Sequence, residues 1–276
     1  MSYRRLESNA FSDDSTWINL GLWTQPNSTF TQANQALAFA LASLVNPNAQ
    51  CLIDMGCGNG DAIGFFVEKF HFPQVIGVNS NSKEYLACFS KFQFSPTVQL
   101  VFSDAIEYLE NQELKHMTGN AALVCVDAVY HFAPSRVHFI SSLTHHRSNI
   151  KSLAMSDIVL SEKWSREKGR LDFITEFVRY WMVRLVAWAS GTPKVNLDCT
   201  LEQITHQLND LGWQVTYSEV VTNQVFEPFS NYCMGRAQNQ PWYSKTTWIL
   251  ISSALFMRFL GWTGAVDFVV YAAKRE

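Results

Sequence analysis

The sequence lacks several patterns that would each point to a particular class of protein. None of its six cysteines forms a Cys-x-x-Cys pair, and no His/Cys cluster has the spacing of a zinc site. No basic stripe is present and the formal net charge is -3, which argues against a nucleic-acid partner. We therefore assign no metal, and we expect the cysteines to be reduced thiols in an intracellular protein.

Long apolar runs are also missing. The longest apolar stretch near the end of the sequence, residues 248–262, is shorter than the ~20 residues that cross a bilayer, and Arg258 interrupts it. The first residues, MSYRRLESNAFSDD, have no apolar segment behind their two arginines, so we read no secretory signal. We expect a cytoplasmic protein without a transmembrane segment.

Apolar runs and helical patterns do alternate regularly over the first half of the chain. Strands separated by helices are typical of a doubly wound parallel α/β sheet, whose ligands bind outside the carboxyl ends of the strands. A helix is expected first, over residues 30–45. The expected strands are 51–53, 74–78, 98–102, 121–126 and 152–160, and the expected helices between them are 61–70, 82–92, 105–114 and 135–143.

The regular alternation of expected strands and helices ends after residue 160. A long aromatic helix is predicted over 171–190, followed by a helix over 200–211, a strand over 213–221, a helix over 248–259 and a last strand over 266–272. We interpret residues 1–276 as one domain, with residues 162–196 inserted as a helical lid.

A glycine-rich stretch, LIDMGCGNG, lies between the first strand of the sheet and the next helix. Gly56, Gly58 and Gly60 follow an apolar run that ends in Asp54, and glycines at such a turn allow close approach of a ligand. The spacing is not that of a dinucleotide fingerprint, because Asp61 stands where its third glycine would be, and no P-loop lysine follows. A glycine turn without any ligand is the alternative.

The string Asp-x-Gly-Cys-Gly-x-Gly resembles the first motif of class I S-adenosylmethionine-dependent methyltransferases, in particular the small-molecule subset that includes tocopherol, sterol and coclaurine methyltransferases. The resemblance implies a Rossmann-like, mostly parallel seven-stranded sheet and S-adenosylmethionine as cofactor. It also implies that Asp54 accepts hydrogen bonds from the ammonium group of the cofactor. The missing Leu-x-Pro-Gly-Gly turn before the fifth strand departs from this family.

The ends of the next strands supply further candidates for cofactor binding by the same resemblance. Asn79, followed by Ser80, stands where the family has an acid that holds the ribose, so Asn79→Asp is expected to tighten binding. Asp104 and Ala105 are assigned to the adenine, although Asp104 also suits a helix N-cap. Asp127 ends the fourth strand and is assigned to the cofactor as well.

Two further segments resemble the small-molecule subset. Residues 17–23, WINLGLW, are similar to a segment that folds over the cofactor, so Trp23 is a cofactor-binding candidate; a helix anchor is the alternative. After the fourth strand, Tyr130 and His131 lie in a string that the subset places at the substrate pocket. Histidine titrates near neutrality, which suits a base, and Tyr130 would be a second polar contact. A purely structural His131 stays open.

The aromatic residues of the expected lid favour a small hydrophobic or aromatic substrate, such as a natural product, although core packing would also explain them. Its arginines leave peripheral membrane contact open. The favoured function is S-adenosylmethionine-dependent methylation at N, C or O of such an acceptor. A cyclopropane-synthase-like lipid-modifying enzyme and a non-catalytic S-adenosylmethionine-binding scaffold are the alternatives. The sequence leaves the oligomeric state open. The arginines of the expected lid are Arg170, Arg179 and Arg184, and its aromatic residues are Phe173, Phe177, Tyr180, Trp181 and Trp188.

Overall fold

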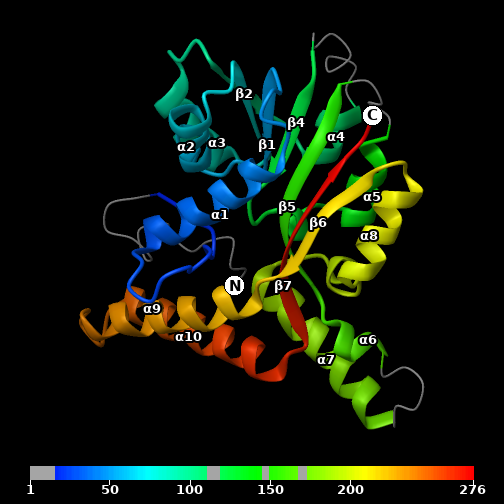
Figure 1. Cartoon of the computed structure of the whole chain (residues 1–276). Helices are drawn as coiled ribbons and strands as arrows, with labels where there is room; N and C mark the ends of the chain where they lie inside the picture. The colour runs from blue at the N-terminus through cyan, green and yellow to red at the C-terminus, as the bar shows by residue number, and fades with distance from the viewer. Residues whose placement is uncertain (1–15, 111–118, 145–148, 167–172) are drawn as a thin grey trace.

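A single seven-stranded sheet runs through the protein (Figure 1). The computed structural model describes residues 16–110, 119–144, 149–166 and 173–276. The strand order is β3-β2-β1-β4-β5-β7-β6, and all neighbours are parallel except β7, which is antiparallel to β5 and β6. This confirms the predicted doubly wound, mostly parallel sheet. The strands are β1 (Cys51–Met55), β2 (Gln74–Asn79), β3 (Val98–Phe102), β4 (Ala121–Cys125), β5 (Ile150–Leu160), β6 (Gln214–Val220) and β7 (Val266–Lys274).

Helices cover both faces of the sheet because successive strand residues point to opposite sides. Leu52 of β1 belongs to one buried apolar cluster, whereas its neighbours Ile53 and Met55 belong to the other. The first cluster is closed by α1 (Phe30–Leu44), α2 (Asp61–Phe70) and α3 (Ser82–Phe92). The second is closed by α4 (Ala105–Glu110), α5 (Arg136–Ser142) and α8 (Leu201–Asp210).

Local sequence signals explain where the helices begin. The hydroxyl of Thr29 accepts from the N–H of Gln32, and the Gln32 side chain accepts from the N–H of Thr29, so a capping box starts α1. The side chain of Asn81 caps α3 in the same position. The predictions of α2, α3 and β3 match the observed bounds, while the expected helix over 105–114 is described only to Glu110 and its remainder lies outside the described residues.

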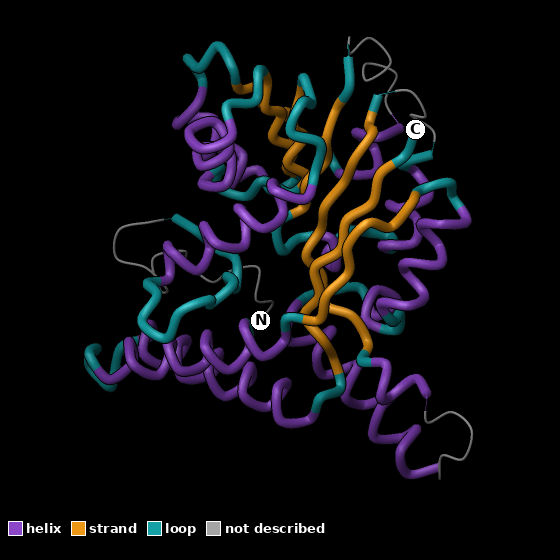
Figure 2. The backbone as a smooth tube through the Cα atoms, viewed as in Figure 1, coloured by secondary structure: helices purple, strands orange, loops and turns teal. Residues whose placement is uncertain are grey.

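A helical cap gathers at the carboxyl ends of the parallel strands, at the bottom of the view in Figures 1 and 2. The predicted insertion 162–196 contains α6 (Glu162–Arg166) and α7 (Phe173–Ser190). A second insertion, between β6 and β7, adds α9 (Phe226–Gln238) and α10 (Lys245–Thr263), which pack against each other. We had expected only a helix over 248–259 there, so the cap is larger than the predicted lid.

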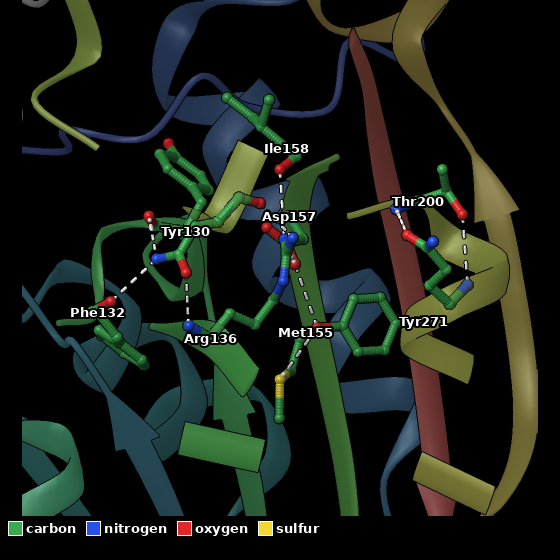
Figure 3. Close-up of polar contacts among 10 residues, drawn as sticks. Tyr130, Phe132, Arg136, Met155, Asp157, Ile158, Thr200 and Tyr271 are labelled. Atoms are coloured by element: carbon green, nitrogen blue, oxygen red, sulfur yellow. Dashed lines mark hydrogen bonds and ion pairs between the residues drawn. The ribbon is translucent and has the colours of Figure 1, made fainter. Parts of the chain in front are cut away.

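A buried ion pair joins α5 to the middle of the sheet (Figure 3). Arg136 at the start of α5 donates to the carboxylate of Asp157 on β5, and both side chains are inaccessible to solvent. The hydroxyl of Tyr271 on β7 lies 3.3 Å from the same carboxylate. Burial lowers the pKa of the Arg136 guanidinium, but Asp157, Tyr271 and Cys199 together raise it by more, so the pKa lies above its ordinary value.

Removing one partner of this pair is expected to destabilise the fold strongly. Asp157→Leu leaves the Arg136 charge buried without its counter-charge, and we expect the free energy of unfolding to fall by about 3–5 kcal/mol. The double variant Arg136→Met, Asp157→Leu removes both charges and should recover at least half of that loss. Urea unfolding followed by circular dichroism measures both.

The exposed pair Lys69–Glu68 provides the control, because Glu68→Ala breaks an ion pair at the surface and should leave the stability nearly unchanged. A double variant that is less stable than Asp157→Leu alone would contradict this account of the buried pair.

Candidate active site

The turn from β1 into α2 has the backbone conformation that its glycines allow. Gly56, Gly58 and Gly60 have φ angles of 82°, 54° and 83°, which L side chains rarely adopt. An added Cβ would lie 2.7 Å from the Cβ of Ala128 at Gly56, and 2.5 Å from the Sγ of Cys88 at Gly60. The sequence-based explanation, close approach of a ligand, is therefore incomplete: these glycines first shape the turn and pack it against the rest of the protein.

A cavity of about 640 Å³ opens beside this turn, at the carboxyl ends of the first four strands. Its walls contain most of the predicted site residues, from segments far apart in the sequence. Gly60 and Trp23 are the two predicted residues that do not line it. Those that do are Asp54, Gly56, Gly58, Asn79, Ser80, Asp104, Ala105, Asp127, Tyr130 and His131.

Asp54, at the end of β1, is one of the residues that line this cavity. It is fully buried, and neither oxygen has a hydrogen-bond partner among the residues that the structure describes. Burial raises its pKa to about 7. A buried carboxylate without partners is costly, and a cation placed next to it would offset that cost.

Asn79, at the end of β2, takes part in a small polar network with an acid that the sequence analysis missed. Its amide group donates to the carboxylate of Glu84 at 3.0 Å and to the carbonyl of Gly58 at 3.1 Å. Asn81 donates to the other oxygen of Glu84 at 2.8 Å. Glu84 also lines the cavity, so an acid is present at the end of β2 but comes from the first turn of α3.

Asp104 caps a helix and also borders the cavity, and its assignment to the adenine stays a prediction. Its carboxylate accepts from the N–H of Ile106 at 2.9 Å, as in a helix cap, and the residue lines the cavity beside Ala105. The cap fixes the side chain at the end of β3, where it borders the same space as Asp54.

Asp127 is held in a strained backbone conformation by two hydrogen bonds. Its φ is 56°, and its carboxylate accepts from the Tyr130 hydroxyl and from the N–H of Leu20, both at 2.7 Å. Burial raises its pKa to about 7, against the effect of these two bonds. The Tyr130 hydroxyl donates its hydrogen to Asp127, so toward a bound molecule the Tyr130 oxygen can only accept a hydrogen bond.

His131 lies in a short turn, Val129–His131, at the junction between the sheet and the cap. Its Nδ1 is 3.4 Å from the hydroxyl oxygen of Thr192, which follows α7. The buried side chain of Asn196 donates to the carbonyls on either side of His131, those of Tyr130 at 3.0 Å and Phe132 at 2.9 Å. Neither Thr192 nor Asn196 was singled out from the sequence, because their contacts exist only in the folded chain.

One wall of the cavity comes from residues 16–20, which overlap the segment 17–23 that we expect to fold over the cofactor. The side chain of Asn19 donates to the carbonyl of Val126 at 3.0 Å, which ties this segment to the end of β4. Of the two tryptophans in the segment 17–23, Trp17 lines the cavity. Trp23 instead packs against Tyr232 of α9, with ring centroids 5.1 Å apart, which corrects the placement that we expected for it.

The cap supplies an apolar wall opposite the polar floor. The predicted lid contributes Val186 of α7, while α9 contributes Phe229. Most of the remaining wall comes from α10, through Phe256, Met257 and Leu260. Of the lid aromatics, Tyr180, Trp181 and Trp188 are exposed, and the side chains of Phe173 and Phe177 lie outside the described residues. The cavity is thus polar at the strand ends and apolar at the cap.

The described part of the chain lacks two features, a metal cluster and a membrane-spanning helix. It contains no group of three or more His, Cys, Asp or Glu side chains that could hold a metal ion. None of its helices combines the length and the apolar character needed to cross a membrane. The expected cytoplasmic location stays a prediction.

Solved structures share this fold across almost the whole chain. The cyclopropane synthase MmaA2 from Mycobacterium tuberculosis superposes with a TM-score of 0.71 at 12% identity, covering 99% of this chain and 96% of that one. The mycolic acid cyclopropane synthase CmaA1, complexed with SAH and CTAB, has a TM-score of 0.70 at 14% identity, covering 97% and 93%. The geranyl diphosphate C-methyltransferase from Streptomyces coelicolor A3(2), in complex with Mg²⁺, geranyl diphosphate and S-adenosyl-L-homocysteine, has a TM-score of 0.60 at 12% identity, covering 97% and 93%.

No protein-family model matches the sequence, and no curated protein does either. At these identities the likeness defines the fold: the chain has the Rossmann-like methyltransferase fold. The neighbours include cyclopropane synthases and a C-methyltransferase, so the likeness does not select the tocopherol and coclaurine subset.

Asp54 should make the stability of the protein depend on pH. Its folded-state pKa of about 7 is above the unfolded value of 3.8, so the folded state holds a proton that the unfolded state has lost between these pH values. The free energy of unfolding therefore falls as pH rises through this range. Between pH 5.5 and 7 the loss due to Asp54 is about 2 kcal/mol. Asp54→Asn should remove that part of the pH dependence, and urea unfolding at several pH values measures it.

Asn209→Asp, which adds an acid on the exposed helix α8, is the control and should not flatten the pH profile. A profile for Asp54→Asn that matches the unsubstituted protein would show that Asp54 titrates at its ordinary pKa.

Asn79→Asp is expected to destabilise the fold, whatever its effect on cofactor binding. The new carboxylate would face the Glu84 carboxylate and the Gly58 carbonyl, the two groups that the Asn79 amide now donates to. We expect a loss of about 1–3 kcal/mol in the free energy of unfolding, measured by urea unfolding. Adding Glu84→Gln should recover part of the loss, because a glutamine amide can donate to Asp at position 79. A gain in stability for Asn79→Asp would contradict this account.

Proposed function

We propose that the protein is an S-adenosylmethionine-dependent methyltransferase that acts on a small, lipophilic acceptor. The observation that carries the proposal is the buried carboxylate of Asp54, which has no described partner and borders a cavity of suitable size. A sulfonium nucleoside with an ammonium group is a cationic ligand that would offset the cost of this charge. The fold, shared with S-adenosylhomocysteine-bound structures, supports the same ligand.

The polar half of the cavity fits the parts of this cofactor. Asp54 accepts from the ammonium group, and Glu84, held by Asn79 and Asn81, accepts from the ribose hydroxyls. Asp104 and the backbone of Ala105 are assigned to the adenine. Glu84 thus supplies the acid that the sequence analysis found missing at position 79.

The apolar half of the cavity is the acceptor side. When bound, S-adenosylmethionine supplies an activated methyl group for in-line transfer. The side chains of the chain itself position the acceptor and exclude water, through the wall formed by Phe229, Phe256 and Met257. If the acceptor arrives protonated, His131 takes the proton: an Nδ1–H bonded to Thr192 leaves the lone pair of a base on Nε2.

A cyclopropane-synthase-like reaction on a lipid is the second candidate. The two mycobacterial-type cyclopropane synthases reach TM-scores of 0.71 and 0.70, above the 0.60 of the C-methyltransferase, and the apolar wall suits an acyl chain. Both candidates use the same cofactor. A scaffold without catalytic activity would bind the cofactor and convert no acceptor.

Calorimetric titration with S-adenosylmethionine and S-adenosylhomocysteine tests the cofactor assignment. We expect micromolar binding of both, with Asp54→Asn and Glu84→Gln each weakening S-adenosylmethionine binding about tenfold to a hundredfold, because each loses a charge-assisted hydrogen bond. Binding to the unsubstituted protein should also weaken as pH falls from 8 to 6, since Asp54 with a pKa of about 7 becomes protonated.

Glu68→Gln removes an exposed acid outside the cavity and should bind both ligands normally. No binding of either ligand would overturn the cofactor assignment and with it the proposed function. Binding that is insensitive to Asp54→Asn and to pH would separate Asp54 from the ammonium group.

A further inference from the structure

The outer face of α10 exposes large apolar side chains in a single stripe. Trp248, Leu255 and Trp262 are 59%, 58% and 82% exposed, and they are seven residues apart, which places them on one side of the helix. The loop before α10 adds Trp242 and Tyr243, 77% and 72% exposed. We call these five residues the α10 outer face. Contiguous exposed apolar residues of this size mark a surface that contacts another apolar phase or molecule.

The inner face of the same helix lines the candidate active site. Ser253, Phe256, Met257 and Leu260 border the cavity, on the side of α10 turned away from Leu255. One helix therefore separates the apolar half of the cavity from the exposed stripe. α10 is apolar on both faces, which is unusual for a helix at the surface of a protein in water.

The charge of this region is opposite to that of the whole chain. Residues 228–266 contain the basic residues Arg236, Lys245 and Arg258 and no acidic residue, although the chain as a whole has a net charge of -3. Lys245 and Arg258 are both exposed on α10, next to the stripe. A second cap helix, α7, adds the exposed Trp181 and Trp188 at the same end of the molecule (Figure 1).

We propose that the α10 outer face docks on the surface of a bilayer that contains anionic phospholipids. Tryptophan and tyrosine partition to the membrane interface, where an apolar ring and a polar N–H or O–H are both accommodated. Lysine and arginine beside them are attracted to anionic headgroups. Docking would place α10, which forms the acceptor side of the cavity, against the bilayer, in which lipophilic molecules dissolve. The membrane would then be the source of the acceptor, and this role rests on the proposed function.

Flotation with vesicles tests the docking without any cofactor, so its failure is distinct from a failure of cofactor binding in calorimetry. The vesicles are phosphatidylcholine alone, or phosphatidylcholine and phosphatidylglycerol in equal parts. We expect binding to the anionic vesicles, weaker binding to the neutral ones, and weakening by high salt. Trp248→Ser, Trp262→Ser should lower the partition coefficient about tenfold or more. Lys245→Gln, Arg258→Gln should abolish the preference for anionic vesicles.

Phe94→Ser is the matched control, since Phe94 is 90% exposed and lies outside the cap. Circular dichroism confirms that each variant is folded, and because all substituted side chains are exposed, their loss should not unfold the protein. The proposal is overturned if the unsubstituted protein does not float, if the tryptophan variant floats as well as the control, or if neutral and anionic vesicles bind equally. Concentration-dependent dimerisation that is lost in the tryptophan variant, without flotation, would instead identify a self-association surface.

Discussion

The geometry of the candidate site depends on a buried guanidinium. Arg136 begins α5, pairs with Asp157 in the middle of β5 and donates to the carbonyl of Asn196, so it connects a helix, the sheet and the segment that leads out of the cap. Asn196 in turn fixes the carbonyls on both sides of His131. The turn that carries His131 is thereby connected, through Asn196 and Arg136, to the sheet. A charge that is expensive to bury enforces this arrangement, because the arginine side chain must find its partners in any compact form of the chain.

The cavity combines two environments that are each costly for the free protein. At the strand ends, Asp54 is desolvated without a described partner, and at the cap, apolar side chains line open space. A ligand with a cationic part and an apolar neighbour relieves both costs at once. The cap helix α10 is apolar on both sides, with an inner face toward the cavity and an exposed aromatic outer face. Both environments lower the stability of the free protein, as is common at functional sites.

The sequence predicts the sheet well because its signals are local. β3 and α3 are predicted to the residue, because Asn81 marks the start of α3 and Pro96 separates α3 from β3, and the glycine motif identifies the strand end where Asp54 lies. The cap was harder to predict. α9 has a proline in its first turn and an internal glycine, and α10 is apolar all round, so neither shows the periodicity of an amphipathic helix. Glu84 was missed because it lies in the first turn of α3 and not at the end of β2, and the packing of Trp23 against Tyr232 depends on the path of the folded chain.

The segment 16–23, which includes the cavity wall 16–20, forms its long-range hydrogen bonds with residues that come later in the chain. Thr16 bonds to Asp61, Asn19 to Val126 and Leu20 to Asp127, and the N–H of Trp23 donates to the carbonyl of Gln224. Because the chain is synthesised from its N-terminus, these partners become available one after another, and the segment cannot form all of its contacts until most of the chain has been made. The pocket is consequently among the last parts of the molecule to be completed during synthesis.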